Sequence, residues 1–387
     1  MVTGAPELSL TSEPWGEVDG QPVFLYTLAG GGGLTVRVAT YGGVVQSILV
    51  PDRSGRSVNV ALGFATLAEY AANTSGADGS ASGGTHFGAL IGRYANRIAG
   101  GGFTLDGRRF DLSGNHGPGD PITLHGGPGG GYSGVVWEGA TDGSGGPGAA
   151  VRLRYVDRDG VNGFPGTVSN EVEYTVTRDN SLRIEYRMST DTPTVVNPTN
   201  HTYFNLAGEG SGAVYDQLLA VNADQVQTVD RAGVPTGFLD VDGTPFDFRS
   251  MKPIGRDLRS AAMPGGEQLA IAWGYDHNCV VRGAGYRLAA VASDPGTGIV
   301  LWTYTDRPGV QLYTANHLMG DLVGTGGRTY RPGDAFALET QLFPDAPNHL
   351  GEPGWPDPVL RPGRVLVSRT TYQFTVADAG LASRIRF

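Results

Sequence analysis

The chain has 387 residues, a formal net charge of −10, 62 glycines, 24 prolines and one cysteine, Cys279. The acidic balance argues against binding to nucleic acid or to an anionic membrane surface. A single cysteine excludes an intramolecular disulfide. Lys252 is the only lysine, which leaves almost no place for Schiff-base chemistry or for the lysine of a phosphate-binding loop.

The sequence shows no targeting or membrane segment. Residues 1–10 lack the basic stretch and apolar core of a signal peptide. No run approaches the ~18 apolar residues that a membrane-spanning helix needs. These features predict a cytoplasmic protein that binds neither membrane nor nucleic acid, and we expect a monomer or a homodimer.

Short runs of alternating apolar and polar residues begin near the N-terminus. Residues 23–27 and 34–40 predict a hairpin across a glycine turn, and residues 44–50 predict a third strand that ends at Pro51. Residues 66–73 are one of few helix candidates. A polar loop rich in glycine, serine and alanine follows at residues 76–84.

Strand-like runs continue to the C-terminal end, with turn signals between them. Asp106-Gly107 is a strong hairpin signal between residues 102–105 and 108–112. Helical periodicity is almost absent and no change of composition marks a linker, so we expect one all-β domain over residues 1–387, a large antiparallel β-sandwich with few short helices. Further strands are predicted at residues 135–140, 150–157, 169–178, 181–189, 217–222, 278–281, 286–293, 299–305, 309–314, 335–341 and 369–376.

Several common motifs fail when their context is considered. Residues 129–134 fit G-x-G-x-x-G by letter, but they follow a loop and precede a strand, whereas dinucleotide binding needs a strand before and a helix after. The seven histidines include no i, i+4 pair and Cys279 has no cysteine partner, so no metal site is expected. The G-x-S-x-G elbow of serine hydrolases is also missing from the sequence.

Two residues are candidates for proton transfer. His201 stands between Asn200 and Thr202 and next to two aromatics, a niche suited to a proton donor near neutral pH. Glu339 lies in an apolar strand, where burial would raise the carboxyl pKa and suit a general base. Each is also compatible with a structural role, as a buried hydrogen-bonded histidine and an outward-facing strand glutamate.

Further polar groups stand at turns or in apolar strands. His125 lies at a glycine turn, where the backbone can approach a ligand closely. Gln311 interrupts an apolar strand. Taken singly, each fits a surface or structural role. The full set of these polar residues is Asn96, Arg97, His125, Asp276 and Gln311. Together with His201 and Glu339, this set can hydrogen-bond a polyhydroxylated ligand and move two protons.

A series of motifs occurs in a fixed order along most of the chain. They are G-R-Y-A-N-R-I-A at residues 92–99 with F-T-L-D-G at 103–107, L-H-G-G at 124–127, T-N-H-T-Y-F-N-L-A-G at 199–208, Y-D-H-N at 275–278, P-G-V-Q-L-Y-T at 308–314, and L-E-T-Q-L-F-P-D-A-P-N at 338–348. In this order they resemble the aldose 1-epimerase (galactose mutarotase) family. One motif alone would be weak evidence, whereas the ordered series is highly specific.

The resemblance implies a galactose mutarotase-like β-sandwich with an open sugar cleft. It implies interconversion of the α and β anomers of free hexoses such as glucose and galactose, without a cofactor. His201 is implied as the general acid, with Asn200 and Tyr203 as supports, and Glu339 as the general base. The implied sugar-binding positions are Asn96, Arg97, His125, Asp276 and Gln311. An aromatic platform is expected from Tyr203, Phe204 or Tyr313.

The sequence departs from the family pattern at one notable position, and two alternative functions are still possible. Pro198 stands where the family usually has leucine, which is expected to affect sugar preference rather than the reaction. An epimerase of a phosphorylated or modified sugar would need basic residues that converge on a phosphate, and Arg93 and Arg97 are the available pair. A non-catalytic carbohydrate-binding module would have no need of both His201 and Glu339.

Overall fold

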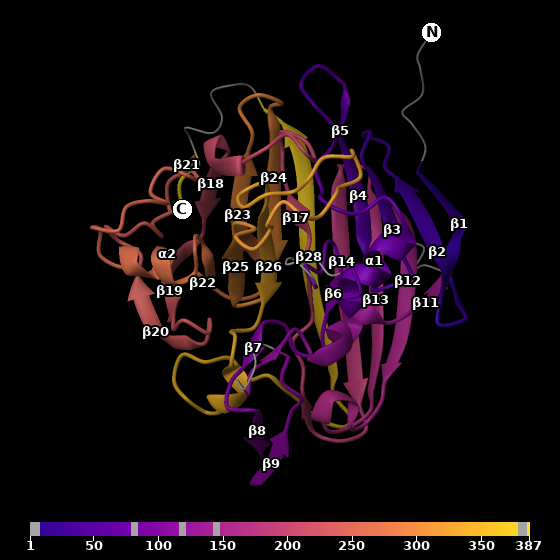
Figure 1. Cartoon of the computed structure of the whole chain (residues 1–387), viewed down its shortest axis with the longest axis vertical. Coiled ribbons are helices and arrows are strands. Elements are labelled where there is room, and N and C mark those ends of the chain that lie inside the picture. The colour runs from indigo at the N-terminus through magenta and orange to yellow at the C-terminus, as the bar shows by residue number, and fades with distance from the viewer. Residues whose placement is uncertain (1–7, 79–83, 116–120, 142–147, 378–384) are drawn as a thin grey trace.

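The computed structural model describes residues 8–78, 84–115, 121–141, 148–377 and 385–387. Antiparallel strands dominate this part of the chain (Figure 1). Its largest sheet has nine strands, in the order β11 (Glu138–Ala140), β12 (Gly148–Asp157), β13 (Val168–Thr177), β14 (Ser181–Thr190), β28 (Val365–Val376), β24 (Ile299–Thr305), β23 (Arg287–Ser293), β18 (Leu218–Val221) and β21 (Lys252–Pro253).

Two smaller sheets accompany the large one. The five-stranded sheet is β1 (Ser9–Val18), β2 (Gln21–Ala29), β3 (Thr35–Ala39), β4 (Val45–Pro51) and β5 (Ser57–Asn59), and its β1 and β2 contact β12 of the large sheet. The six-stranded sheet is β17 (Tyr203–Phe204), β26 (Phe336–Gln341), β25 (Gly309–Tyr313), β22 (Asp276–Val281), β19 (Ala223–Val229) and β20 (Pro235–Asp240). An antiparallel bridge between Ala61 and Phe204 joins these two sheets.

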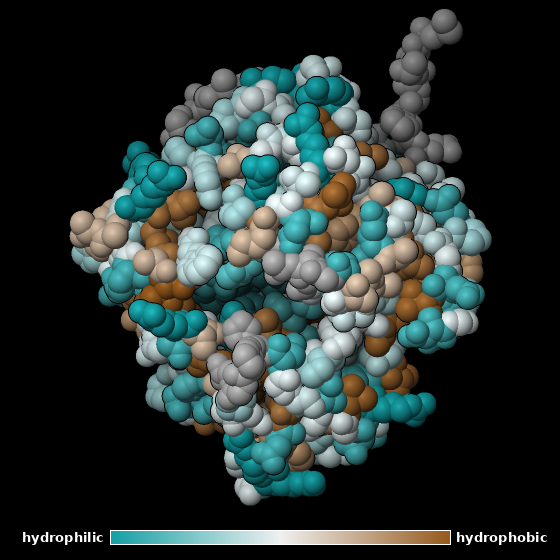
Figure 2. Space-filling model, in the orientation of Figure 1, coloured by the Kyte–Doolittle hydropathy of each residue, from teal (hydrophilic) through white to brown (hydrophobic). Residues whose placement is uncertain are grey.

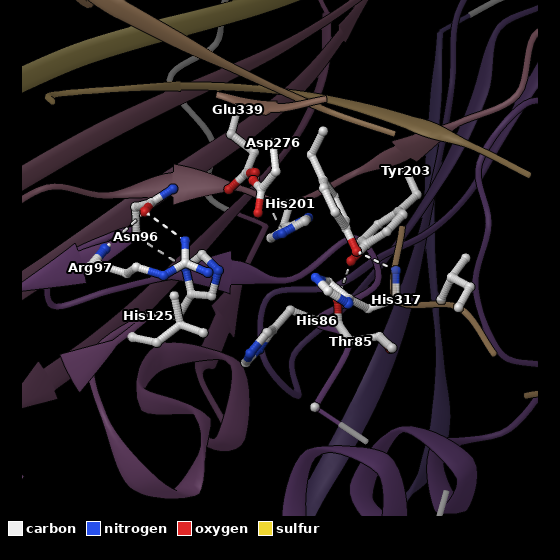
Figure 3. Close-up of a pocket in the computed structure, with 14 residues that line it drawn as sticks. Thr85, His86, Asn96, Arg97, His125, His201, Tyr203, Asp276, His317 and Glu339 are labelled. Atoms are coloured by element: carbon white, nitrogen blue, oxygen red, sulfur yellow. Dashed lines mark hydrogen bonds and ion pairs between the residues drawn. The ribbon is translucent and has the colours of Figure 1, made fainter. Parts of the chain in front are cut away.

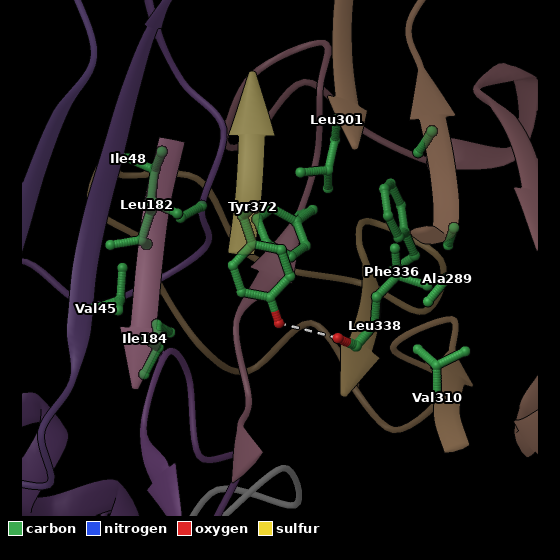
Figure 4. Packing of buried hydrophobic residues seen from close by; sticks show 14 of the residues in the cluster. Val45, Ile48, Leu182, Ile184, Ala289, Leu301, Val310, Phe336, Leu338 and Tyr372 are labelled. Carbon is green, nitrogen blue, oxygen red and sulfur yellow. Dashed lines mark hydrogen bonds between the residues drawn. The ribbon is translucent and has the colours of Figure 1, made fainter. Parts of the chain in front are cut away.

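The main hydrophobic core lies between the large sheet and the two smaller ones (Figure 4). Val45 and Ile48 of β4 share it with Leu182 and Ile184 of β14, and Leu301 of β24 shares it with strands of the six-stranded sheet. Each sheet therefore has one face in this core, as expected for a β-sandwich. The predicted fold class is confirmed.

Strand β26 shows how this sandwich exposes a functional face. Phe336 and Leu338 point into the main core, and the Tyr372 hydroxyl donates to the Leu338 carbonyl at 3.0 Å (Figure 4). Because side chains alternate along a strand, Ala337 and Glu339 lie on the opposite face of the sheet. Ala337 there belongs to a second buried cluster. The same alternation that fills the core thus places Glu339 on the outer face.

The predicted local elements are largely confirmed. The glycine turn joins β2 and β3, and Asp106-Gly107 joins β8 (Gly102–Leu105) and β9 (Arg108–Asp111). The helix expected at residues 66–73 is α1 (Leu67–Ser75), and Thr66 and Glu69 form a capping box at its start. The glycine-rich stretch at residues 129–134 forms a 3₁₀ turn, η1 (Pro128–Gly134), in place of a strand–helix junction.

Some elements were not predicted. The strands β1, β19 and β20 and the short helix α2 (Gly266–Ile271) fall in stretches without a strong periodic signal. Part of the loop predicted at residues 76–84 lies outside the described residues. No helix in the described ranges is both long enough and apolar enough to cross a bilayer.

Candidate active site

A cavity of about 180 Å³ opens on the outer face of the six-stranded sheet. Figure 2 shows the hollow near the middle of the molecular face, with hydrophilic residues on its walls. Figure 3 shows the Glu339 and Asp276 carboxyl groups directed into the same space as the His201 ring. Six of the seven predicted site residues line the cavity; its walls are Gly84, Thr85, His86, Asn96, Arg97, Leu124, His125, His201, Tyr203, Asp276, Tyr313, His317, Leu318 and Glu339.

His201 is held by its backbone and by an aromatic neighbour. It lies between β16 (Thr199–Asn200) and β17, its N–H donates to the Ala89 carbonyl at 2.9 Å, and its own carbonyl accepts from Gly88 N–H at 2.9 Å. The imidazole stacks on the Tyr203 ring, with centroids 4.7 Å apart. Asn200 donates to the Gly88 carbonyl at 2.7 Å, so it supports the segment rather than the imidazole.

Strand register sets the acid candidate opposite the base candidate. Tyr203 of β17 pairs with Ala337 of β26, and continuing this antiparallel register by two residues brings His201 opposite Glu339. The His201 Nε2 and Glu339 Oε1 atoms are 3.5 Å apart, and both side chains are buried. Within the described structure, His201 Nδ1 and Glu339 Oε2 are buried without a hydrogen-bond partner. Buried polar atoms of this kind indicate a site built for a ligand.

Burial shifts the pKa values of His201 and Glu339 in opposite directions. Desolvation raises the pKa of Glu339 well above its usual value, and the negative charge of Asp276 adds to the effect. Desolvation also lowers the pKa of His201, with a smaller contribution from His86. Burial therefore favours the neutral imidazole of His201 and the protonated carboxyl group of Glu339.

Asn96 and His125 fix one another on the far wall. Both have left-handed backbone conformations, with φ of 64° and 52°. The Asn96 N–H donates to His125 Nδ1 at 3.1 Å, and the His125 N–H donates to the Asn96 carbonyl at 3.0 Å. Since Nδ1 accepts, the neutral His125 ring carries its proton on Nε2. Gly126 in the adjoining turn packs closely against the Gly92 carbonyl, and the expected approach of this turn to a ligand stays a prediction.

Asp276 is oriented by Gln311. The Gln311 side-chain amide donates to Asp276 Oδ1 at 2.7 Å, and Gln311 lies directly across from Glu339 in the β25–β26 pair. Gln311 is buried but is not part of the cavity wall. Its predicted contact with the sugar stays a prediction, whereas its observed contact positions the carboxylate that faces the cavity.

Arg97 is held from two sides. Its Nη1 donates to Asn96 Oδ1 at 3.3 Å, and the turn between β19 and β20 packs against its guanidinium group. Gly233 in that turn has a φ of 77°, and a Cβ atom there would lie 2.5 Å from Arg97 Cζ. Glycine suits this backbone conformation, and a Cβ at this position would force the Arg97 guanidinium group to shift.

Replacing Gly233 with alanine is expected to raise the KM for sugar about tenfold, because displacing one charged hydrogen-bond donor costs about 1.5–3 kcal/mol. Polarimetric kinetics would measure the KM of the variant and of the wild type. Gly243→Ala is the matched control, since Gly243 has a similar φ of 69° and nothing within 4 Å of the added Cβ. Equal KM values for the two variants would show that the contact with Arg97 is unimportant.

The aromatic platform and two additional histidines complete the cavity. Tyr203 and Tyr313 line it, whereas Phe204 lies in the main core, so Phe204 is wrong as a candidate platform. His86 and His317 line the cavity and were not predicted. For His86 the only sequence signal is its position between the polar loop at residues 76–84 and the motif at residues 92–99.

His86 has a defined tautomer. The Ser133 hydroxyl donates to the Gly130 carbonyl at 2.7 Å, so the 2.8 Å contact between His86 Nδ1 and Ser133 Oγ is a donation from the imidazole. The second ring nitrogen, Nε2, is therefore an acceptor. Burial lowers the pKa of His86 to about 4, which keeps the ring neutral near pH 7.

A family model described as aldose 1-epimerase matches residues 25–373. The chain belongs to the aldose 1-epimerase family. It is therefore an isomerase, a mutarotase, and the resemblance seen in the ordered motifs is confirmed.

Relatives in this epimerase family match over nearly their whole length. Galactose mutarotase of Sus scrofa is 37% identical over 346 residues, which cover 89% of this chain and 92% of that protein. Aldose 1-epimerase of Escherichia coli K12 is 36% identical over 361 residues, covering 92% and 96%. The crystal structure of galactose 1-epimerase from Lactobacillus acidophilus is 26% identical with a TM-score of 0.81, covering 96% of this chain and 100% of that chain.

The epimerase cavity contains one group of side chains with metal-binding atom types. Donor atoms of His125, His201 and Glu339 lie within 4.8 Å of one another. The His125 Nδ1 atom accepts from Asn96 N–H, so its Nε2 atom is protonated and has no lone pair for a cation. This tautomer argues against a metal site at these three residues.

Arg93 takes no part in the epimerase cavity. Its side chain is buried, its Nε lies 2.7 Å from Asp157 Oδ2, and its Nη1 donates to the Pro165 carbonyl at 2.7 Å. The pair Arg93 and Arg97 therefore does not converge on one ligand, although only three residues separate them in the sequence.

Proposed function

We propose that this epimerase interconverts the α and β anomers of free hexoses such as glucose and galactose, with His201 as the acid and Glu339 as the base. The observation that carries the proposal is the buried pair itself, 3.5 Å apart at the cavity wall, with one ring nitrogen and one carboxylate oxygen that find no hydrogen-bond partner among the described residues. The names of the relatives, which include galactose mutarotase, support this choice of sugar.

The reaction follows from an acid and a base that lie next to one another, one for each of the two oxygens on C1. Glu339 takes the proton from the C1 hydroxyl while His201 donates a proton to the ring oxygen, and the C1–O5 bond breaks to give the open-chain aldehyde. Rotation about C1–C2 presents the other carbonyl face. In the reverse transfers Glu339 gives its proton back to the C1 oxygen, His201 regains a proton from O5, and the C1–O5 bond re-forms. Each positioned group contributes about 10²–10⁴-fold.

The directions of the two pKa shifts run against the roles of the two residues in the reaction. Burial favours neutral His201 and protonated Glu339, whereas the reaction needs the reverse arrangement with the same total of one proton. Sugar oxygens and hydroxyls supply hydrogen bonds that offset the desolvation of the charged forms. Substrate binding therefore favours the reactive tautomer of the pair.

One wall of the cavity can recognise the sugar hydroxyls. Sugar oxygens can accept hydrogen bonds from Arg97, Asn96 and the His125 Nε2–H, and Asp276 can accept from sugar hydroxyls. A carboxylate that accepts from two neighbouring hydroxyls rejects sugars that lack one of them. Since Gln311 fixes Asp276 at 2.7 Å, this acceptor is held in place before the sugar arrives. The preference among hexoses is assigned to this wall.

The direct test is polarimetry on freshly dissolved α-D-glucose and α-D-galactose. The optical rotation is expected to relax to equilibrium faster with enzyme than without. No acceleration with several hexoses and pentoses would refute the proposal. Glucose 6-phosphate is expected to be a poor substrate, because Arg93 is directed away from the cavity and leaves Arg97 as the cavity's arginine.

The pH profile tests the protonation state of the pair. The kcat/KM of the free enzyme is expected to fall at high pH, when the pair loses its one proton. Asp276→Asn removes a negative charge that raises the pKa of Glu339. The carboxylate then ionises more easily, so the alkaline limb is expected to move to lower pH.

The measurement is kcat/KM against pH, corrected for uncatalysed mutarotation. Tyr313→Phe serves as the control, because it changes a wall residue paired with Asp276 in the strand register without changing the charge. An alkaline limb that stays in place in Asp276→Asn, or moves to higher pH, would contradict the assignment of Glu339 as the group that loses the proton.

A further inference from the structure

His86 lines the sugar cavity, and the reaction proposed above does not use it. Its backbone has a φ of 59°, which is the left-handed conformation also adopted by the cavity residues Asn96 and His125. Residues other than glycine adopt this conformation only uncommonly, and they keep it where the surrounding structure fixes them. The backbone of His86 therefore indicates that the position of its side chain matters.

The segment that carries His86 is attached to the reaction centre. The backbone N–H and the hydroxyl of Thr85 donate to Asn73 Oδ1 at 3.0 Å and 2.9 Å. The Thr85 carbonyl accepts from the Tyr203 hydroxyl at 2.8 Å. Since the Tyr203 ring also stacks on His201, one short series of contacts joins the backbone beside His86 to the proposed acid.

The glycine-rich turn η1 supports the His86 ring. Three successive glycines, at residues 129–131, have positive φ values of 73°, 77° and 54°, and the turn they form brings Ser133 Oγ to 2.8 Å from His86 Nδ1. A Cβ on Gly130 would lie 2.7 Å from Ser133 Oγ and 3.9 Å from His86 Cε1. Glycine at residue 130 thus suits the backbone and leaves room for the contact. The motif that resembles a dinucleotide fingerprint by letter holds this histidine.

This support leaves a neutral acceptor at the cavity. Because His86 Nδ1–H donates to Ser133, the lone pair lies on Nε2. The His86 ring stacks beside His201 with centroids 6.3 Å apart, and the His125 ring lies 5.1 Å away; all three residues border the cavity (Figure 3). A neutral nitrogen acceptor suits a hydroxyl group, which can donate, and does not suit a fluorine atom, which cannot.

We propose that His86 is a specificity-determining residue whose Nε2 atom accepts a hydrogen bond from one hydroxyl of the sugar. This inference rests on the proposed epimerase function and adds a substrate contact to it. The hydroxyl is not the one on C1, which gives its proton to Glu339 in the reaction. A sugar with fluorine in place of the contacted hydroxyl leaves Nε2 without a donor, so the enzyme rejects it.

The test compares glucose with its 2-, 3-, 4- and 6-deoxyfluoro derivatives by polarimetry, in wild-type enzyme and in His86→Phe. Phenylalanine keeps a flat ring but has no acceptor. The wild-type kcat/KM is expected to favour hydroxyl over fluorine about tenfold or more at the contacted position. His86→Phe is expected to lower this ratio about tenfold at that position and less than about twofold at the other three.

Three further variants separate the hydrogen bond from the shape of the ring. His86→Gln is expected to keep part of the ratio, because its amide oxygen can accept. Ser133→Ala keeps the histidine but removes the acceptor for Nδ1–H, so the ratio is expected to fall at the same position as in His86→Phe. His349→Phe is the matched control with wild-type ratios, a histidine outside the cavity whose ring stacks on Trp355 at 3.7 Å.

The outcomes distinguish the two proposals. No acceleration with glucose by the wild-type enzyme refutes the epimerase proposal. Acceleration with glucose, together with hydroxyl-to-fluorine ratios that His86→Phe leaves unchanged at all four positions, refutes the His86 contact alone. An equal fall at all four positions also refutes it, because a histidine that only supports the cavity would act on every substrate alike. If His86→Phe does not fold, Ser133→Ala decides by the same ratios.

Discussion

Glu339→Gln is expected to lower kcat about 10²–10⁴-fold with little change in KM, because the amide keeps the shape and hydrogen bonding of the carboxyl group but cannot take the C1 proton. Glutamine also removes the cost of burying a carboxyl group whose pKa is raised by desolvation, so the variant is expected to be at least as stable as the wild type. Polarimetry gives the rate, and calorimetric titration with glucose gives the affinity.

Glu209→Gln is the matched control for this prediction. Glu209 accepts from the Tyr330 hydroxyl at 2.6 Å and is not part of the sugar cavity, so the rate is expected to stay near that of the wild type. His201→Gln is expected to lose about as much activity as Glu339→Gln, and the double variant little more, because acid and base act as one unit. A Glu339→Gln enzyme within about tenfold of the wild-type rate would exclude Glu339 as the base.

Arg93→Met is expected to lower the free energy of unfolding by about 3–5 kcal/mol, because it leaves the buried Asp157 carboxylate without its partner. Arg93 also donates to the Pro165 carbonyl and, at 3.2 Å, to the Thr194 hydroxyl. These acceptors lose their donor in the variant, which adds to the loss. Urea unfolding at pH 7 is the measurement.

A double-variant cycle and a pH series identify the cause of this loss. Adding Asp157→Leu to Arg93→Met is expected to recover part of the stability, because no charge then stays buried. Burial raises the pKa of Asp157, whereas Arg93 lowers it. Without Arg93 the native state binds a proton that the unfolded state releases, so the loss is expected to shrink as the pH falls toward 5. A stable variant that binds sugar poorly would instead place Arg93 in sugar binding.

The fold class could be predicted because alternation and turn residues are local signals. Most strand positions, the capping box of α1 and the Asp106-Gly107 hairpin follow from residues within a few positions of one another. The β19–β20 hairpin was missed, because β20 is half exposed and the turn between the strands carries no Asn-Gly or Asp-Gly signal. That omission hid the turn that packs against the Arg97 guanidinium group.

The chemistry of the site could be anticipated only through the ordered motifs. Nothing local to His201 or Glu339 shows that the β17–β26 register places them together, because pairing between distant segments is not visible in a local pattern. Arg93 and Arg97 show the same limit. They lie in one short motif, yet one is paired with Asp157 in the interior and the other faces the sugar cavity. Only the three-dimensional partners separate a structural arginine from a binding one.

The tautomers of His86 and His125 have a consequence for inhibitor design. Contacts with Ser133 and with the backbone of Asn96 lock them, so one ring offers an acceptor and the other a donor, with centroids 5.1 Å apart. A competitive inhibitor needs a donor directed at His86 Nε2 and an acceptor directed at His125 Nε2–H. A scaffold with two acceptors, such as a dicarboxylate, would place an oxygen lone pair against the lone pair of His86 Nε2. Two inhibitors of the same shape are therefore expected to differ in affinity when they differ in where they carry a donor and where an acceptor.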